Sequence, residues 1–75
     1  MNLYIINEVL YDYTPGMAVI AAESMSHCEE LFMKEFAFSE YSKERVQKEF
    51  NLADIKVIEN VNHPAGVVSC VYGGG

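Results

Sequence analysis

Two nearly continuous apolar runs open the chain, and both are typical of β-strands. The first covers residues 3–10 and the second covers residues 17–22. The segment 11–16 between them contains proline, which fixes φ, and glycine, which is conformationally free, so it predicts a rather long turn. The pattern therefore predicts a β-hairpin of two central strands that are covered on much of both faces.

The middle of the chain changes to helical spacing. Apolar residues recur every three or four positions over 25–37, which predicts an amphipathic helix. Ser24 is a good N-cap, and Ser26 with Glu29 offers an alternative capping box. A charged segment over 43–50 carries two apolar residues four positions apart, which predicts a short and exposed second helix.

The last third returns to strand patterns. Residues 55–61 alternate apolar and polar side chains, as a half-exposed strand does, and residues 67–72 form a second β-branched run. The turn residues of 62–66 predict that these two strands form a C-terminal hairpin. The order β-β-α-(α)-β-β predicts one α+β domain over residues 1–75, with a helix packed on an antiparallel or mixed sheet.

The size of the chain limits how much apolar surface it can hide. A domain of 75 residues buries only roughly 60–65% of its unfolded surface, yet 51% of these residues are hydrophobic. We therefore expect a homo-oligomer, in the first instance a dimer. The strands 55–61 and 67–72 are the interface candidates, because unpaired strand edges recruit partners.

The charge and the cysteine content restrict the partners and the compartment. The net charge of −6 should repel nucleic acid and anionic lipid, so neither is an expected direct partner, although an acidic surface can also imitate nucleic acid. No apolar run approaches the ~20 residues that cross a membrane. With two cysteines and no signal-peptide pattern, we expect a cytoplasmic protein with reduced thiols.

Residues that could bind metal or act as nucleophiles are few and scattered. His27, Cys28, His63 and Cys70 do not have the converging spacing that zinc needs, and Cys28 falls on the apolar stripe of the predicted helix. A Cys70–His63 pair across the C-terminal hairpin would need a lowered thiol pKa, which an acidic chain does not favour. The sequence thus predicts no metal, no cofactor and no enzymatic activity.

Exposed tyrosines and terminal glycines are the candidate binding residues. Tyrosine brings a large contact area at a low cost in entropy, and glycine lets a partner approach the backbone closely. Gly73, Gly74 and Gly75 could equally be a conjugation tail or a passive linker. The predicted binding residues are Tyr11, Asp12 and Tyr13 in the hairpin turn and Tyr72, Gly73 and Gly74 at the C-terminus.

Several stretches together resemble a loose group of small bacteriophage accessory proteins. They are the opening Met-Asn-Leu-Tyr-Ile-Ile with Tyr-Asp-Tyr at 11–13, the segment 19–24 before an acidic helix, and 55–59 followed by a Pro-bearing turn and Gly-Val-Val-Ser at 66–69. Members of that group end in Gly-Val-Val/Ile and then Ser-Phe-Asn-Ala-Gly, whereas this chain departs from the pattern over 70–75. The resemblance implies a non-enzymatic counter-defence protein. Such a protein blocks a host immune protein such as a CRISPR effector, or sequesters a nucleotide signal, and no site residues carry over.

A second family shares the glycine end. Ubiquitin-like modifiers and sulfur carriers have a β-β-α-β order, a similar length and a Gly-Gly terminus. Their chemistry needs a flexible diglycine that projects into the channel of an activating enzyme. In this chain a β-branched strand and Tyr72 run directly up to Gly73, which leaves a short spacer, so this alternative rests on the glycines alone.

Overall fold

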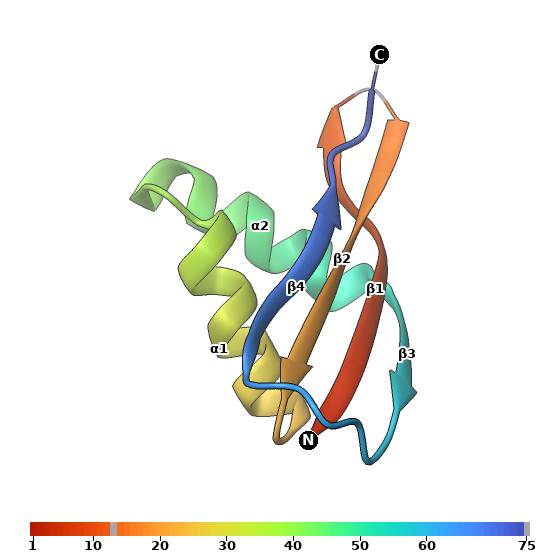
Figure 1. Ribbon diagram of the computed structural model, residues 1–75. Coiled ribbons are helices and arrows are strands. Elements are labelled where there is room, and N and C mark those ends of the chain that lie inside the picture. The colour runs from red at the N-terminus through yellow and green to blue at the C-terminus, as the bar shows by residue number, and fades with distance from the viewer. Residues whose placement is uncertain (13, 75) are drawn as a thin grey trace.

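One four-stranded sheet and two helices make up the fold. The computed structural model describes residues 1–12 and 14–74. Figure 1 shows both helices on one face of the sheet, so the predicted α+β class is confirmed. The elements follow the order β1 (Asn2–Asp12), β2 (Thr14–Ala22), α1 (Met25–Phe36), α2 (Glu40–Leu52), β3 (Asp54–Ile58) and β4 (Gly66–Val71).

The sheet has the order β3-β1-β2-β4, and every neighbouring pair is antiparallel. The two long strands are central, as predicted. The predicted C-terminal hairpin is wrong, because β3 and β4 lie on opposite edges of the sheet. Crossing three strand spacings of about 4.8 Å requires about 14 Å, and the seven-residue connection 59–65 can span up to about 23 Å. This connection is therefore long enough to place one strand on each free edge of the hairpin.

The hairpin connection is also tighter than predicted. Asp12 pairs with Thr14, so Pro15 and Gly16 lie inside β2 and not in a turn. The predicted cap of α1 is confirmed, since the Ser24 hydroxyl accepts a hydrogen bond from the His27 N–H at 3.2 Å. The helix α2 begins and ends a few residues beyond its predicted limits, because a Ser39–Ser42 capping box starts it earlier.

The core lies between the helices and one face of the sheet. Phe32 of α1 is fully buried, and its ring centroid lies 4.9 Å from that of Phe36 and 5.1 Å from that of Phe50 of α2. Ile6 of β1 and Ile20 of β2 are fully buried against this cluster. Burying a large apolar side chain stabilises the fold by about 2–3 kcal/mol, so this layer holds the helices on the sheet.

The second face of the sheet carries no helix in the described part of the chain. Leu3, Ile5 and Val19 point to this face by the strand register, and each is only half-buried. The sequence predicted cover on much of both faces, which is wrong for this one. Both helices follow β2 in the chain and pack together, so their apolar stripes share the same face.

Candidate functional site at the hairpin end

The end of β1 nearest the hairpin turn has an irregular backbone. Glu8 and Leu10 have positive φ angles of 65° and 54°. The pairing with β2 shifts register between Asn7 and Val9 and again between Val9 and Asp12. A bulky residue in this conformation costs of order 1–3 kcal/mol, so Leu10 keeps it only because its surroundings hold it.

Two distant segments hold the backbone of Leu10 by hydrogen bonds. The Leu10 N–H donates to Oε1 of Glu49, on α2, at 3.0 Å. The carbonyl oxygen of Leu10 accepts a hydrogen bond from the Gly73 N–H at 3.0 Å. The irregular part of β1 is therefore fixed by α2 and by the C-terminal tail together.

The tail crosses β2 at a glycine. A Cβ on Gly16 would lie 2.1 Å from the carbonyl oxygen of Val71 and 2.8 Å from the nitrogen of Gly73, which no real side chain tolerates. Beyond this crossing, the Thr14 hydroxyl donates to the carbonyl oxygen of Gly74 at 2.6 Å and accepts from its N–H at 2.9 Å. Gly16 is therefore the residue that lets the tail lie along the hairpin.

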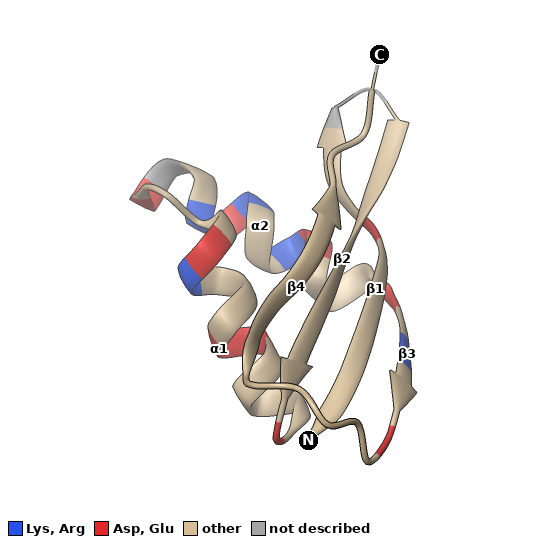
Figure 2. Ribbon diagram, viewed as in Figure 1, with Lys and Arg blue, Asp and Glu red and all other residues tan. Residues whose placement is uncertain are grey.

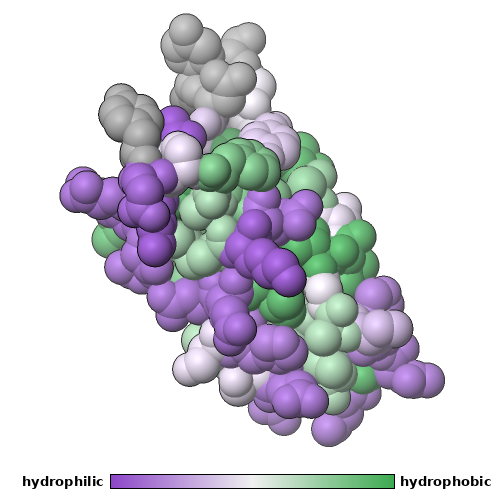
Figure 3. All heavy atoms as spheres, turned by 90° about the vertical axis from the view of Figure 1, so that its left-hand side faces the viewer, coloured by the Kyte–Doolittle hydropathy of each residue, from purple (hydrophilic) through white to green (hydrophobic). Residues whose placement is uncertain are grey.

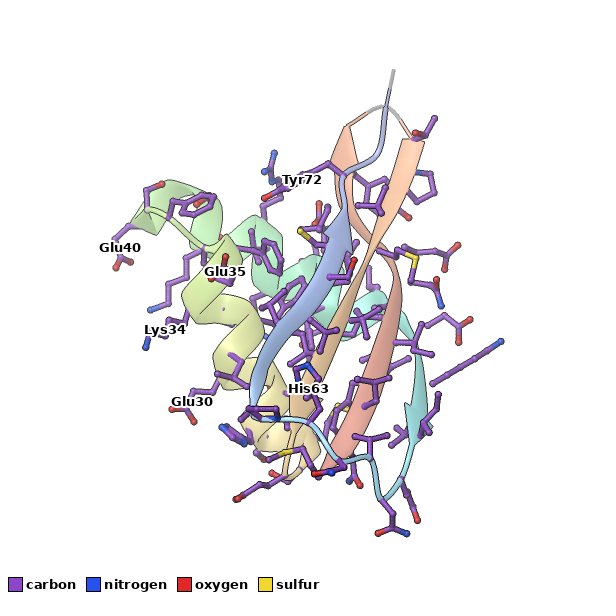
Figure 4. The ribbon with its side chains drawn as sticks, viewed as in Figure 1. Glu30, Lys34, Glu35, Glu40, His63 and Tyr72 are labelled. Carbon is purple, nitrogen blue, oxygen red and sulfur yellow. The ribbon has the colours of Figure 1, made fainter. Side chains whose placement is uncertain are left out.

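This crossing brings the two predicted binding patches to one end of the molecule. Tyr11 directly follows Leu10 and is 46% exposed, and Tyr72 directly precedes Gly73 and is 55% exposed. Figure 4 shows Tyr72 on the side of the helices, where its ring meets that of Phe36 edge-on at 6.2 Å. Gly73 itself is buried, whereas Gly74 is exposed.

The other predicted residues of the hairpin turn are Asp12 and Tyr13. Asp12 ends β1 opposite Thr14. The prediction for Tyr13 lies outside the described residues, as does that for Gly75. The geometry of the site therefore rests on Tyr11, Tyr72, Gly73 and Gly74.

A cleft of about 250 Å³ opens between β1 and α2, and we call it the hairpin cleft. Sequence reasoning missed its α2 side, which it treated as an ordinary solvated helix surface. The available signal was spacing, because Arg45, Lys48 and Leu52 are three and four residues apart and share one helix face. The residues that line the cleft are Glu8, Tyr11, Arg45, Lys48, Glu49 and Leu52.

Charge is distributed unevenly between the two sides of the molecule. Figure 2 shows most acidic and basic residues on the helices and few on the strands. In Figure 3, which views the helix side, hydrophilic residues border a band of hydrophobic ones. The hairpin cleft itself combines two acidic and two basic side chains with those of Tyr11 and Leu52, so a partner that approaches it meets mixed charges.

The thiols and imidazoles do not form a reactive group. Burial, and then the neighbouring charge of Glu29, raises the pKa of the Cys28 thiol to about 11, so it stays protonated at neutral pH. Cys70 is exposed near the end of β4, whereas Nδ1 of His63 lies 2.7 Å from the carbonyl oxygen of Pro64, before β4 begins. About 13 Å of strand from residue 66 to residue 70 keeps Cys70 and His63 apart.

Neither a metal-binding cluster nor a membrane-spanning helix is found among the described residues. Among residues 1–12 and 14–74, no group of three or more His, Cys, Asp or Glu residues could hold a metal ion. Within the same residues, no helix combines the length and the apolar character needed to span a membrane. No protein family, curated protein or solved structure matches this chain.

Proposed function

We propose that this chain is a non-enzymatic binding protein that occupies a surface of a bacterial host defence protein. The single observation that carries the proposal is the convergence of the hairpin end and the C-terminal tail. The Gly73–Leu10 hydrogen bond places the exposed rings of Tyr11 and Tyr72 at the same end of the molecule. The counter-defence role itself rests on the resemblance to bacteriophage accessory proteins.

The composition of this surface favours a protein partner. Tyr and Arg are enriched among the residues that dominate binding energy at protein interfaces, and here Tyr11 and Arg45 line one cleft. The backbone of the neighbouring Leu10 is fixed, because its N–H donates to the Glu49 carboxylate and its carbonyl oxygen accepts from the Gly73 N–H. A rigid surface loses less entropy on binding, so the same contacts give a higher affinity.

A nucleotide is a poorer fit to the hairpin cleft. Its volume of about 250 Å³ lies below the ≈ 300–1,000 Å³ that is typical of small-ligand pockets. The carboxylates of Glu8 and Glu49 also line it beside the two cations, which weakens its attraction for phosphate. Of the two counter-defence modes, blocking a protein is therefore the one that this site supports better.

The ubiquitin-like alternative requires the tail to project. Gly73 is buried and donates to Leu10, and Gly74 exchanges two hydrogen bonds with Thr14. An activating enzyme would have to break these bonds, each contributing about 0.5–1.5 kcal/mol. Mass spectrometry after incubation with ATP and host extract tests this alternative, because an adenylate, thiocarboxylate or isopeptide adduct at the C-terminus would replace our proposal.

The experiment that tests the proposal compares two aromatic variants. Tyr11→Ala removes an exposed ring from the hairpin cleft, and Phe38→Ala removes an exposed ring from the α1–α2 connection as a matched control. Each variant serves as bait in a pull-down from host lysate, and the captured protein is then titrated. We expect Tyr11→Ala to weaken binding by about 1–3 kcal/mol, which is roughly 5- to 150-fold, and Phe38→Ala to leave it unchanged.

The same variants are then expressed from phage and plated on strains with and without the captured defence protein. Wild type and Phe38→Ala should plate well on both strains, and Tyr11→Ala should plate poorly only on the defended one. Equal binding by both variants would remove the hairpin end as the binding surface. Absence of any partner together with equal plating of a deletion phage would contradict the proposed function as a whole.

A further inference from the structure

The helix-free face of the sheet is a separate surface with its own character. We call it the open face, and the antiparallel register decides which side chains point to it, because paired residues share a face. Its members come from all four strands. They are Leu3, Ile5, Asn7, Met17, Val19, Ala21, Asp54, Lys56, Ile58, Gly66, Ser69 and Val71.

The chain itself covers only one end of the open face. Figure 1 shows the connection 59–65 passing across the ends of β1 and β2 beside the N-terminus. The Val61 N–H donates to the carbonyl oxygen of Met1 at 2.8 Å, and Ala21 at this end has no exposed surface. Towards the other end Val71 is 58% exposed, and the side chains of Ile5, Met17 and Val19 are only partly buried.

The charge of the open face differs from that of the whole chain. The register places two charged residues of opposite sign on it, Asp54 and Lys56. Glu8, at the irregular part of β1, adds a carboxylate at its rim, where it lines a hollow with Asn7, Met17 and Val71. The chain carries −6 in total, so nearly all of its excess negative charge lies elsewhere, much of it on the helices (Figure 2). Each open face therefore carries about one net negative charge, far less than the helices, so two of them can approach with little repulsion while the acidic helices stay outside, which suits a second copy of this chain.

The strand edges are poorer contact surfaces than the open face. The edge strand β3 has only five residues and carries Lys56. The other edge strand, β4, is irregular, because its pairing with β2 shifts register between Val19 and Ile20. Short edge strands, lysines and bulges are the devices that prevent edge-to-edge pairing. The contact between two copies is therefore expected between faces and not between edges.

We propose that two copies pack open face against open face in a symmetric dimer. Four strands about 4.8 Å apart and about five residues long offer a patch of roughly 19 × 17 Å, one end of which the connection 59–65 covers. With side-chain relief, two such patches bury on the order of 700–1,000 Å², which is the size of a weak, transient interface. The dimer is independent of the proposed function, because the hairpin cleft lies on the helix side.

Light scattering coupled to size exclusion tests the dimer with two valine variants. Val71 points to the open face, whereas Val57 pairs with Tyr4 and points to the helix side, and both are exposed on edge strands, at 58% and 44%. Val71→Lys and Val57→Lys therefore add the same charge on opposite faces. Ser69→Lys adds a second charge to the open face, and circular dichroism confirms that each variant is folded.

At about 100 µM, wild type and Val57→Lys should show twice the 8.4 kDa chain mass. Val71→Lys and Ser69→Lys should weaken dimerisation at least tenfold and shift to the single-chain mass. A monomeric wild type at this concentration would overturn the proposal. Dissociation by Val57→Lys with retention by Val71→Lys would overturn it as well, because it would place the contact at the β3 edge.

Discussion

Replacing Gly16 with alanine should detach the C-terminal tail from the hairpin. The new Cβ would lie 2.1 Å from the carbonyl oxygen of Val71 and 2.8 Å from the nitrogen of Gly73, and both are backbone atoms that cannot rotate away. The tail must therefore move. We expect its hydrogen bonds to Leu10 and Thr14 to be lost together.

The expected loss can be worked from these contacts. The Gly73–Leu10 hydrogen bond contributes about 1 kcal/mol, and the exposed Thr14–Gly74 bonds add about as much together. Displacement of Tyr72 from Phe36 costs about another 1 kcal/mol. The smaller conformational freedom of alanine in the unfolded chain returns about 0.4–1 kcal/mol. The free energy of unfolding should therefore fall by about 2 kcal/mol, which lowers the melting temperature by roughly 10 °C in a domain of this size.

Thermal and urea unfolding at one fixed protein concentration measure this change. Gly74→Ala is the control, because a Cβ there meets nothing within 4 Å, and it should leave stability unchanged. Gly16→Ala is also made in a chain that ends at Cys70, which lacks both clashing backbone atoms. In this shorter chain the substitution should cost far less. An equal cost in both chains would refute the reasoning, since the loss would then not come from the tail.

Two further predictions concern single side chains. Glu49→Ala leaves the part-buried N–H of Leu10 without its acceptor, so the free energy of unfolding should fall by about 1–3 kcal/mol. Glu49→Gln keeps an acceptor oxygen and should lower it less. Equal losses for the two variants in chemical denaturation would contradict the assigned hydrogen bond. Because the pKa of Cys28 rises from 9.0 to about 11 on folding, the unfolded chain loses this proton first. Stability should therefore fall by on the order of 2 kcal/mol as pH rises through that window, and parallel pH profiles for wild type and Cys28→Ala would refute this.

Local patterns predicted most of the secondary structure. The 3.6-residue spacing of α1 and the Ser24 cap are properties of neighbouring residues, so they could be derived without the fold. The hairpin turn was misplaced because Pro15 and Gly16 normally signal a turn. In this chain Gly16 serves a contact with the tail, whose sequence lies more than fifty residues away.

The candidate site was predictable only in pieces. Residue type alone indicated Tyr11 and Tyr72, because exposed tyrosines favour interfaces. Their common location depends on the hydrogen bond between Leu10 and Gly73, and no short-range pattern encodes it. The positive φ of Leu10 was equally invisible, since leucine disfavours that conformation and adopts it only under long-range restraint.

The sequence by itself determined the element types, their order and the two central strands, because periodicity and capping act over a few residues. Only the tertiary structure decided the placement of β3 and β4 on opposite edges, which follows from the reach of the connection 59–65 and not from its composition. It also decided that both helices cover the same face of the sheet. That choice leaves the open face uncovered and places α2 where Glu49 can hold the hairpin end.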